Sequence, residues 1–333
     1  MSTLYIIEEG AVVRKEGERL KVYSARDGLL LEMPTAQLEQ VVLIGNVTVT
    51  APVVRLLLEQ GIGLVYMTSG GRLLGRLQPA ESKNVPLRWA QFQAAADPAA
   101  SLAIARSMVC GKVSNQRAFL QKAARDGVSG LEEAIDHLKA LAERARRAHS
   151  LDALRGIEGA AAAAYFRQWP RLIKAFGFPF PGRVRRPPTD PVNSLLSLGS
   201  VLLLNEVLAA CQVVGFDPYV GYLHMDRYGR PALALDLMEE FRPVLVDSTV
   251  LSFVNRGMVD PEDFDVGIGG TRTLKRPALK RFLEAWEEKR RTMVQHPVFD
   301  WQVPYWRVIE LQARVLAKVL LGELQEYVPF LVR

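Results

Sequence analysis

The feature that most constrains the fold is a change in hydrophobic periodicity at about residue 90. Before this point, short aliphatic and β-branched runs alternate with turns that contain Gly, which predicts strands. Beyond it, apolar residues recur at helical spacing in segments rich in Ala, Leu, Arg and Glu. We therefore expect an α+β protein of two domains, with a small, mostly-β N-terminal domain followed by a larger all-α domain.

The domain boundaries follow from the same change. We place the β-rich domain at residues 1–80, a linker at 81–92 and the helical domain at 93–333. A chain of 333 residues agrees with this division, because one domain usually takes about 150 residues. We expect the β-rich domain to serve packing or dimerisation, and the helical domain to carry the chemistry. Its helices are predicted at Trp89–Ala105, Asn115–Asp126, Gly130–Ala148, Leu151–Phe176, Val192–Val214, Pro231–Val250, Arg276–Met293 and Tyr305–Leu324.

A long apolar run, Leu195–Gly215, has the length of a membrane span. Asn205 and Glu206 lie in its middle, where they would be costly in lipid, so we interpret the run as a buried core helix. The start of the chain lacks the pattern of a secretory signal. The two cysteines are 101 positions apart, which favours a reducing compartment. We expect a cytoplasmic protein with no membrane contact.

The charge is distributed unevenly around a modest net value of +6. Residues 139–186 carry 11 basic against 3 acidic side chains, and residues 271–291 carry 8 against 3. Between them, residues 236–265 carry 8 acidic against 2 basic. One such run alone is usually a solvated helix face. Basic segments attract phosphate and clustered carboxylates attract divalent metal, so the combination is typical of an enzyme that cuts or joins nucleic acid.

Glu158 stands out within the predicted helix at 151–176. At helical spacing it shares an apolar face with Leu154, Ala161 and Tyr165. An ionised carboxylate stays on such a face only if it is paired, protonated or bound to metal. Two explanations remain open, an ion pair with Arg155 one turn earlier and a role as a ligand.

His224 and a group of acids follow further along the chain. His224 lies in the run GYLH at 221–224, where a histidine that serves only the core is the alternative to a ligand. Asp236 and Glu239 are three residues apart on one helix face, and like charges at this spacing repel. Either a divalent cation or Arg242 as a counter-ion would relieve the repulsion, and an acidic first helical turn is a further explanation.

Taken together, one imidazole and two or three carboxylates suit Mn²⁺ or Mg²⁺. Zinc is disfavoured, because the sequence offers neither thiolate pairs nor a histidine cluster. Such a metal would polarise a scissile phosphate, and the 139–186 segment would hold the phosphodiester backbone.

Six short sequence runs in a fixed order make the chain resemble a known family. They are GIGLVY at 61–66 with GRLLG at 71–75, LRGIEG at 154–159 followed by Tyr165, DPVNSLLS at 190–197, GYLH at 221–224, and LDLMEEFRP at 235–243. With these motifs the chain resembles, over its full length, the integrase and endonuclease subunit of CRISPR adaptation.

The resemblance implies a function and a site. In that family, a homodimer joins the 3′-OH ends of a short DNA duplex to the CRISPR repeat by transesterification, and also cleaves DNA. Its usual partner is a small ferredoxin-like protein that bridges two dimers. The family's metal ligands would fall on Glu158, His224 and Glu239, with Asp236 as an accessory acid. Charge clustering alone adds possible DNA contacts at Arg155, Arg167, Lys174, Arg183, Arg185 and Arg186.

Two other functions stay open from the sequence. The first is a non-catalytic DNA-binding scaffold, in which the acidic helix is a salt-bridge surface for a partner protein. The second is a metal hydrolase of small phosphoesters, which is disfavoured because GIGG at 267–270 is not a phosphate-binding loop.

Overall fold

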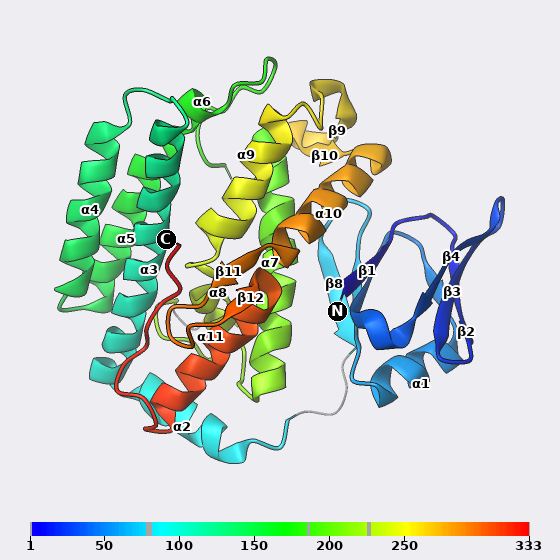
Figure 1. Ribbon diagram of the computed structural model, residues 1–333, viewed down its shortest axis with the longest axis horizontal. Coiled ribbons are helices and arrows are strands. Elements are labelled where there is room, and N and C mark those ends of the chain that lie inside the picture. The colour runs from blue at the N-terminus through cyan, green and yellow to red at the C-terminus, as the bar shows by residue number, and fades with distance from the viewer. Residues whose placement is uncertain (1, 78–81, 185–186, 225–227, 333) are drawn as a thin grey trace. The chain divides into compact units, whose positions relative to one another are not determined.

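The computed structural model describes residues 2–77, 82–184, 187–224 and 228–332. It divides into a β-rich unit and a mostly helical unit, which confirms the α+β fold class (Figure 1). The units are residues 1–81 with 273–287, and residues 82–272 with 288–333. This differs from the expected division in two places. Helix α2 already begins at Val85, within the expected linker, and segment 273–287 groups with the β-rich unit.

The β-rich unit consists of two four-stranded sheets with one helix. One sheet has the order β1-β5-β7-β8, and the other has the order β4-β3-β2-β6. Leu56 and Leu57 of α1 share a hydrophobic core with Leu43 of the first sheet and Leu20 of the second. The elements are β1 (Ser2–Ile6), β2 (Val12–Glu16), β3 (Arg19–Ser24), β4 (Gly28–Pro34), β5 (Leu38–Ile44), β6 (Thr48–Val49), α1 (Ala51–Glu59), β7 (Gly63–Met67) and β8 (Leu73–Leu77).

In the helical unit, α7 packs against α8, α9 and α11, while α3, α4 and α5 pack against one another (Figure 1). A short hairpin of β11 and β12 accompanies the helices, so the unit is mostly rather than wholly helical. Its elements, together with α10, are α2 (Val85–Ala96), α3 (Pro98–Arg125), α4 (Glu132–Arg146), α5 (Leu151–Phe166), α6 (Trp169–Leu172), α7 (Pro191–Val214), α8 (Ala232–Met238), α9 (Ser248–Asn255), β9 (Phe264–Val266), β10 (Arg272–Leu274), α10 (Arg276–Arg291), β11 (Met293–Gln295), β12 (Gln302–Pro304) and α11 (Tyr305–Leu320).

Helix α7 is the apolar run that the sequence singled out. The helix has 24 residues, and the mean hydropathy of 1.7 in its most apolar 18-residue window would suffice for a membrane span by length and composition. However, 56% of the most apolar window is buried inside the protein, where α7 packs against α8 and α11. Burial of this kind is typical of a core helix.

The helices that carry the candidate site begin at capped positions. The Ser150 side chain accepts a hydrogen bond from the Ala153 backbone N–H and starts α5. Asp97 caps α3 in the same way through the Ala99 N–H. The predicted helix at 231–250 is interrupted, because α8 ends at Met238 and a π-helical segment, Arg242–Asp247, precedes α9. Glu239 lies at this interruption.

Candidate functional site

Glu158 occupies the face of α5 that the spacing predicted. Leu154, Ala161 and Tyr165 on that face are fully buried, and the Glu158 side chain retains 27% exposure. Its carboxylate pairs with the Lys112 ammonium of α3. The alternative of an ion pair with Arg155 is wrong, because Arg155 pairs with Asp152 instead.

Lys112 is a site residue that the sequence analysis missed. It is 3% exposed, and its Nζ lies 2.5 Å from Glu239 Oε2 while also contacting Glu158. One ammonium therefore joins a carboxylate of α5 to a carboxylate at the end of α8. A search for a charged residue on an apolar helix face, which singled out Glu158, would also have found Lys112. Lys112 lies one turn beyond Met108 on the buried stripe of α3.

His224 is held in place by Asp236. Its Nδ1 lies 2.6 Å from Asp236 Oδ1, and its Nε2 lies 4.0 Å from Glu239 Oε1. Because an acceptor faces Nδ1, this nitrogen carries the proton and Nε2 keeps its lone pair. Figure 1 places α8, which carries Asp236, close to α3 and α7.

Asp236 does more than orient the imidazole. Its carboxylate also accepts hydrogen bonds from the backbone N–H groups of Tyr222, Leu223 and His224, at 2.6, 2.9 and 3.0 Å. A side chain at Gly221 would meet Asp236 Oδ2 at 2.7 Å, so only Gly lets the loop approach so closely. Asp236 is fully buried behind this loop, which makes it an organiser of the site.

Glu239 is buried and ionised. Burial alone would raise its pKa, but the positive charges on Arg242 and Lys112 outweigh this effect and lower the pKa to about 2. Arg242 Nη2 lies 3.3 Å from Glu239 Oε1, as expected of a counter-ion. Glu239 Oε2 accepts no well-aligned hydrogen bond despite its burial. This oxygen is instead held by the ion pair with Lys112 Nζ at 2.5 Å.

Glu240 turns away from its neighbour. Its carboxylate accepts a hydrogen bond from the Tyr327 hydroxyl at 2.7 Å and another from the Phe330 N–H at 2.8 Å. Burial raises its pKa to about 7, against the opposing effect of these bonds. Asp236, Glu239 and Glu240 are each no more than 2% exposed. The acidic helix is therefore no surface for a partner protein, which removes the basis of the scaffold alternative.

The donor set fits a hard divalent cation. Two carboxylates and an imidazole lone pair converge from α5, the end of α8 and the 221–224 loop, and Lys112 shows that positive charge is favoured between the carboxylates. Across the described residues, however, no group of three His, Cys, Asp or Glu side chains is arranged as a ready metal cage. The Lys112 ammonium separates the two carboxylates, so binding of a metal requires Lys112 to move.

The basic residues of the 139–186 segment differ in their surroundings. Arg155 donates to the Leu223 carbonyl oxygen at 2.9 Å and so supports the loop of His224. Arg167 and Lys174 are exposed. Arg183 is half-buried, and its Nη1 donates to Asn193 Oδ1 at 2.8 Å. Arg185 and Arg186 lie outside the described residues.

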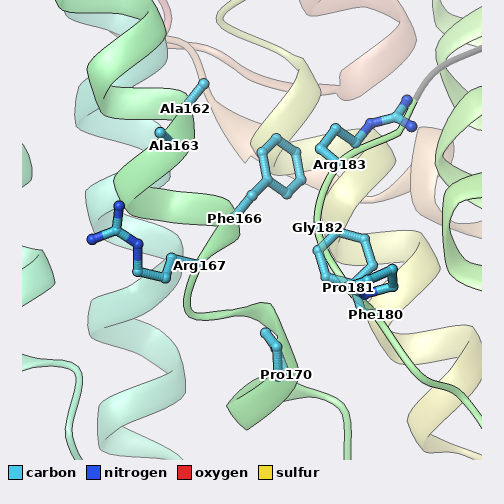
Figure 2. A pocket seen from close by; sticks show the side chains of 9 residues that line it. All are labelled: Ala162, Ala163, Phe166, Arg167, Pro170, Phe180, Pro181, Gly182 and Arg183. Carbon is cyan, nitrogen blue, oxygen red and sulfur yellow. The ribbon is translucent and has the colours of Figure 1, made fainter.

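A cavity of about 740 Å³ lies beside α5. Figure 2 shows Phe166 projecting from α5 toward the loop that carries Phe180 and Arg183. The two aromatic rings are 6.2 Å apart between centroids. The lining is apolar or basic throughout, and comprises Ala162, Ala163, Phe166, Arg167, Pro170, Phe180, Pro181, Gly182 and Arg183. Ala162 is one turn beyond Glu158, so the cavity adjoins the helix that carries the candidate site.

Comparison with known proteins identifies the family. The family model of the CRISPR associated protein Cas1 matches residues 4–288. A curated relative, the CRISPR-associated endonuclease Cas1 3 of Thermus thermophilus, is 44% identical over all of this chain and 98% of its own length. The chain belongs to the Cas1 family, and is thus a CRISPR adaptation protein whose curated relatives are named endonucleases.

Solved structures share the fold. A Cas1 protein from Thermotoga maritima gives a TM-score of 0.84 at 26% identity, covering 98% of this chain and 99% of that one. A Cas6-RT-Cas1–Cas2 complex gives 0.80 at 27% identity, covering all of this chain and 36% of that one. A casposase bound to an integration product gives 0.85 at 23% identity over 98% and 93% of the two chains, a likeness of fold alone.

Proposed function

We propose that this chain is a metal-dependent DNA endonuclease and integrase that joins 3′-OH ends of protospacer DNA to the CRISPR repeat by transesterification. The observation that carries the proposal is that Glu158 and Glu239 both pair with one buried cation, Lys112, while His224 Nε2 lies 4.0 Å from Glu239. These three side chains would hold Mn²⁺ or Mg²⁺. The ion would polarise the scissile phosphate and stabilise the attacking and leaving oxygens.

The protein's own groups prepare the site for phosphate. Asp236 fixes the His224 imidazole so that Nε2 faces Glu239. The charges of Glu158 and Glu239 are balanced by Lys112 and Arg242. If a divalent ion took the place of the Lys112 ammonium, the ion and Arg242 would together carry one positive charge more than the two carboxylates balance, which favours a phosphodiester.

The cavity beside α5 supports contact with a DNA strand. Phe166 offers a partly exposed ring for an unstacked base, with the buried Phe180 packed against it, and Arg167 and Arg183 on the lining would contact the flanking phosphates. Lys174 is exposed in the same segment, and Arg155 with Arg185 and Arg186 completes the set proposed from charge. No acidic side chain repels a strand from this lining.

We further propose a homodimer that works in the cytoplasm with a small ferredoxin-like partner. The Cas1–Cas2 complex among the structural neighbours supports a second protein in the assembly. Cys110 and Cys211 are buried and form no disulfide, in agreement with a reducing compartment.

Strand transfer of a 3′-OH duplex into a repeat-bearing plasmid tests the proposal. We expect joining with Mn²⁺, none with EDTA, and at least a hundredfold loss in Glu158→Ala and His224→Ala, because each removes one of the three ligands. Glu143→Ala and His149→Ala are matched controls, since both residues are exposed. Full activity in either site variant, with its thermal melt unchanged, would remove the site assignment.

A further inference from the structure

The strap, residues 324–332, follows the last helix and runs alongside α3 (Figure 1). It is anchored by Phe330, which is 1% exposed and stacks on Phe241 with 5.8 Å between ring centroids. Tyr305 meets the same ring edge to face at 5.9 Å. The strap is therefore part of the packed interior of the helical unit.

The strap holds Glu240 by hydrogen bonds from neutral donors. The Tyr327 hydroxyl and the Phe330 N–H bind one carboxylate oxygen each. Gln312 Nε2 adds a third bond at 3.1 Å to Glu240, and also donates to the Tyr327 oxygen at 3.0 Å. Because Glu240 directly follows Glu239, these contacts fix the backbone that presents the proposed metal ligand.

The strap also holds α3, close to Lys112. Asn115 Nδ2 donates to the carbonyl oxygens of both Glu240 and Phe330 at 2.8 Å, and Asn115 Oδ1 accepts from the Val332 N–H at 3.0 Å. One residue before Lys112, a side chain at Gly111 would meet Pro329 Cβ at 2.6 Å. A glycine at this point allows the strap to lie directly on the α3 backbone.

We propose that the strap is a positioning element of the candidate metal site. Tyr327 holds Glu240, and Asn115 links Glu240 to the strap, so that Glu239 and Lys112 keep their positions relative to each other. This inference rests on the proposed function. The strap connects the two elements, α3 and the end of α8, whose side chains meet in the site.

The burial of Glu240 argues against a purely space-filling role. A carboxylate at 1% exposure, bound by neutral donors, is costly to bury, and an apolar residue would fill the same volume at lower cost. Unlike an apolar side chain, the carboxylate also fixes the orientation of Glu240 relative to the strap. Its two oxygens accept from separate points of the strap, so the chain at Glu239 is fixed in rotation as well as in depth.

Titration calorimetry of the full chain with Mn²⁺ alone tests the inference. Tyr327→Phe removes one donor to Glu240 and keeps the ring. We expect its Mn²⁺ Kd to rise about tenfold, the range known when a partner that orients metal ligands is lost. Strand-joining kcat should fall while KM for DNA stays unchanged, because the strap does not line the cavity beside α5.

Two control variants separate positioning from stability. Leu331→Ala alters the strap at an exposed side chain that is 39% accessible. Ile309→Val loses a buried methyl group in α11 and gives a loss of thermal stability comparable to that of Tyr327→Phe. Both should keep the wild-type Kd.

Gly111→Ala is a second test variant, because its new Cβ displaces Pro329 without removing a hydrogen-bond donor. It too should weaken Mn²⁺ binding, and it decides the question if Tyr327→Phe does not fold. A wild-type Kd in Tyr327→Phe or in a folded Gly111→Ala would overturn the inference and leave the proposed function intact. Failure of the wild-type chain to bind Mn²⁺ would overturn both.

Discussion

Asp236 accepts hydrogen bonds from three consecutive backbone N–H groups while it holds the imidazole of His224. The sequence analysis assigned it a catalytic role as an accessory acid. Its geometry instead predicts a mainly structural residue. Replacing the carboxylate by an amide in Asp236→Asn removes one acceptor oxygen and leaves a buried N–H without a partner. We expect a loss of about 2 kcal/mol or more in the free energy of unfolding, measured by urea denaturation.

The control for this prediction is Asp265→Asn, an exposed acid in the same charge cluster, which should unfold like the wild type. Glu158→Gln should also be stable, since its carboxylate is partly exposed. If Asp236→Asn keeps wild-type stability but loses strand joining, Asp236 acts directly in catalysis, as the sequence suggested.

The sequence singled out residues where one polar side chain stood among apolar ones. Glu158 on an apolar helix face and His224 between Leu223 and Met225 are two such residues, and both lie at the candidate site. Lys112 was not predicted as a site residue, because the sequence pattern did not show the full length of its helix. Residues 98–125 form one helix, whereas the sequence predicted two helices with Lys112 in the gap between them. The pattern of one helix also does not show which carboxylates pair with Lys112, because these lie 46 and 127 positions away.

At the scale of elements, the helix predicted at 231–250 breaks for a reason that is visible in the sequence. Pro243 has no N–H to donate to the carbonyl oxygen of Glu239, so the regular α-helical hydrogen bond cannot form. The chain widens into a π-helical segment, a geometry often found at functional sites. The apolar residues keep their helical spacing across this break, so the sequence pattern predicted one continuous helix.

Asp247 ends the π-helical segment and binds α5 through the Tyr165 hydroxyl at 3.0 Å. Burial raises its pKa from 3.8 to about 7, against opposing contributions from Tyr165, Arg183, Arg242 and Lys112. Because the folded pKa exceeds the unfolded one, the folded state holds the proton more strongly. The stability from this group is complete below pH 4 and is lost as the pH rises to about 7, by up to about 4 kcal/mol.

Asp247→Asn tests this pH dependence because an amide does not titrate. The free energy of unfolding, measured by urea denaturation from pH 4 to pH 8, should decline less in Asp247→Asn than in the wild type. The variant should therefore gain stability relative to the wild type at pH 8. Parallel pH profiles for the two proteins would show that Asp247 does not titrate in this range.

At the scale of the whole molecule, the change of periodicity showed that the chain has two units. It did not show to which unit each later segment belongs. The segment 273–287 is helical in pattern, as predicted, yet it groups with the β-rich unit, and its Arg276 lies 2.5 Å from Glu9. Periodicity is a local property, so it reports that a segment is a helix. It does not report which core the helix covers, because that depends on contacts across more than 190 residues of chain.

The distribution of charge over the molecule leads to a prediction about DNA. Release of counterions lowers log K linearly with log salt, by about 0.9 for each phosphate contact on duplex DNA. Arg167, Lys174 and Arg183 are the members of the proposed contact set that face solvent or the cavity. Replacing all three by Ala should reduce the slope by about 2.7, measured by fluorescence anisotropy of a labelled duplex between 50 and 200 mM salt, about the range in which such contacts are resolved.

Arg155 supplies the control, because its guanidinium is engaged by Asp152 and the Leu223 carbonyl oxygen. Arg155→Ala should leave the salt slope unchanged and lower strand joining, since the loop of His224 loses its support. If the triple variant keeps the wild-type slope, the phosphates are bound elsewhere, and the basic segment from 271 to 291 becomes the next surface to test. If Arg155→Ala lowers the slope by about one unit, Arg155 leaves its internal partners to reach DNA, as charge clustering alone had suggested.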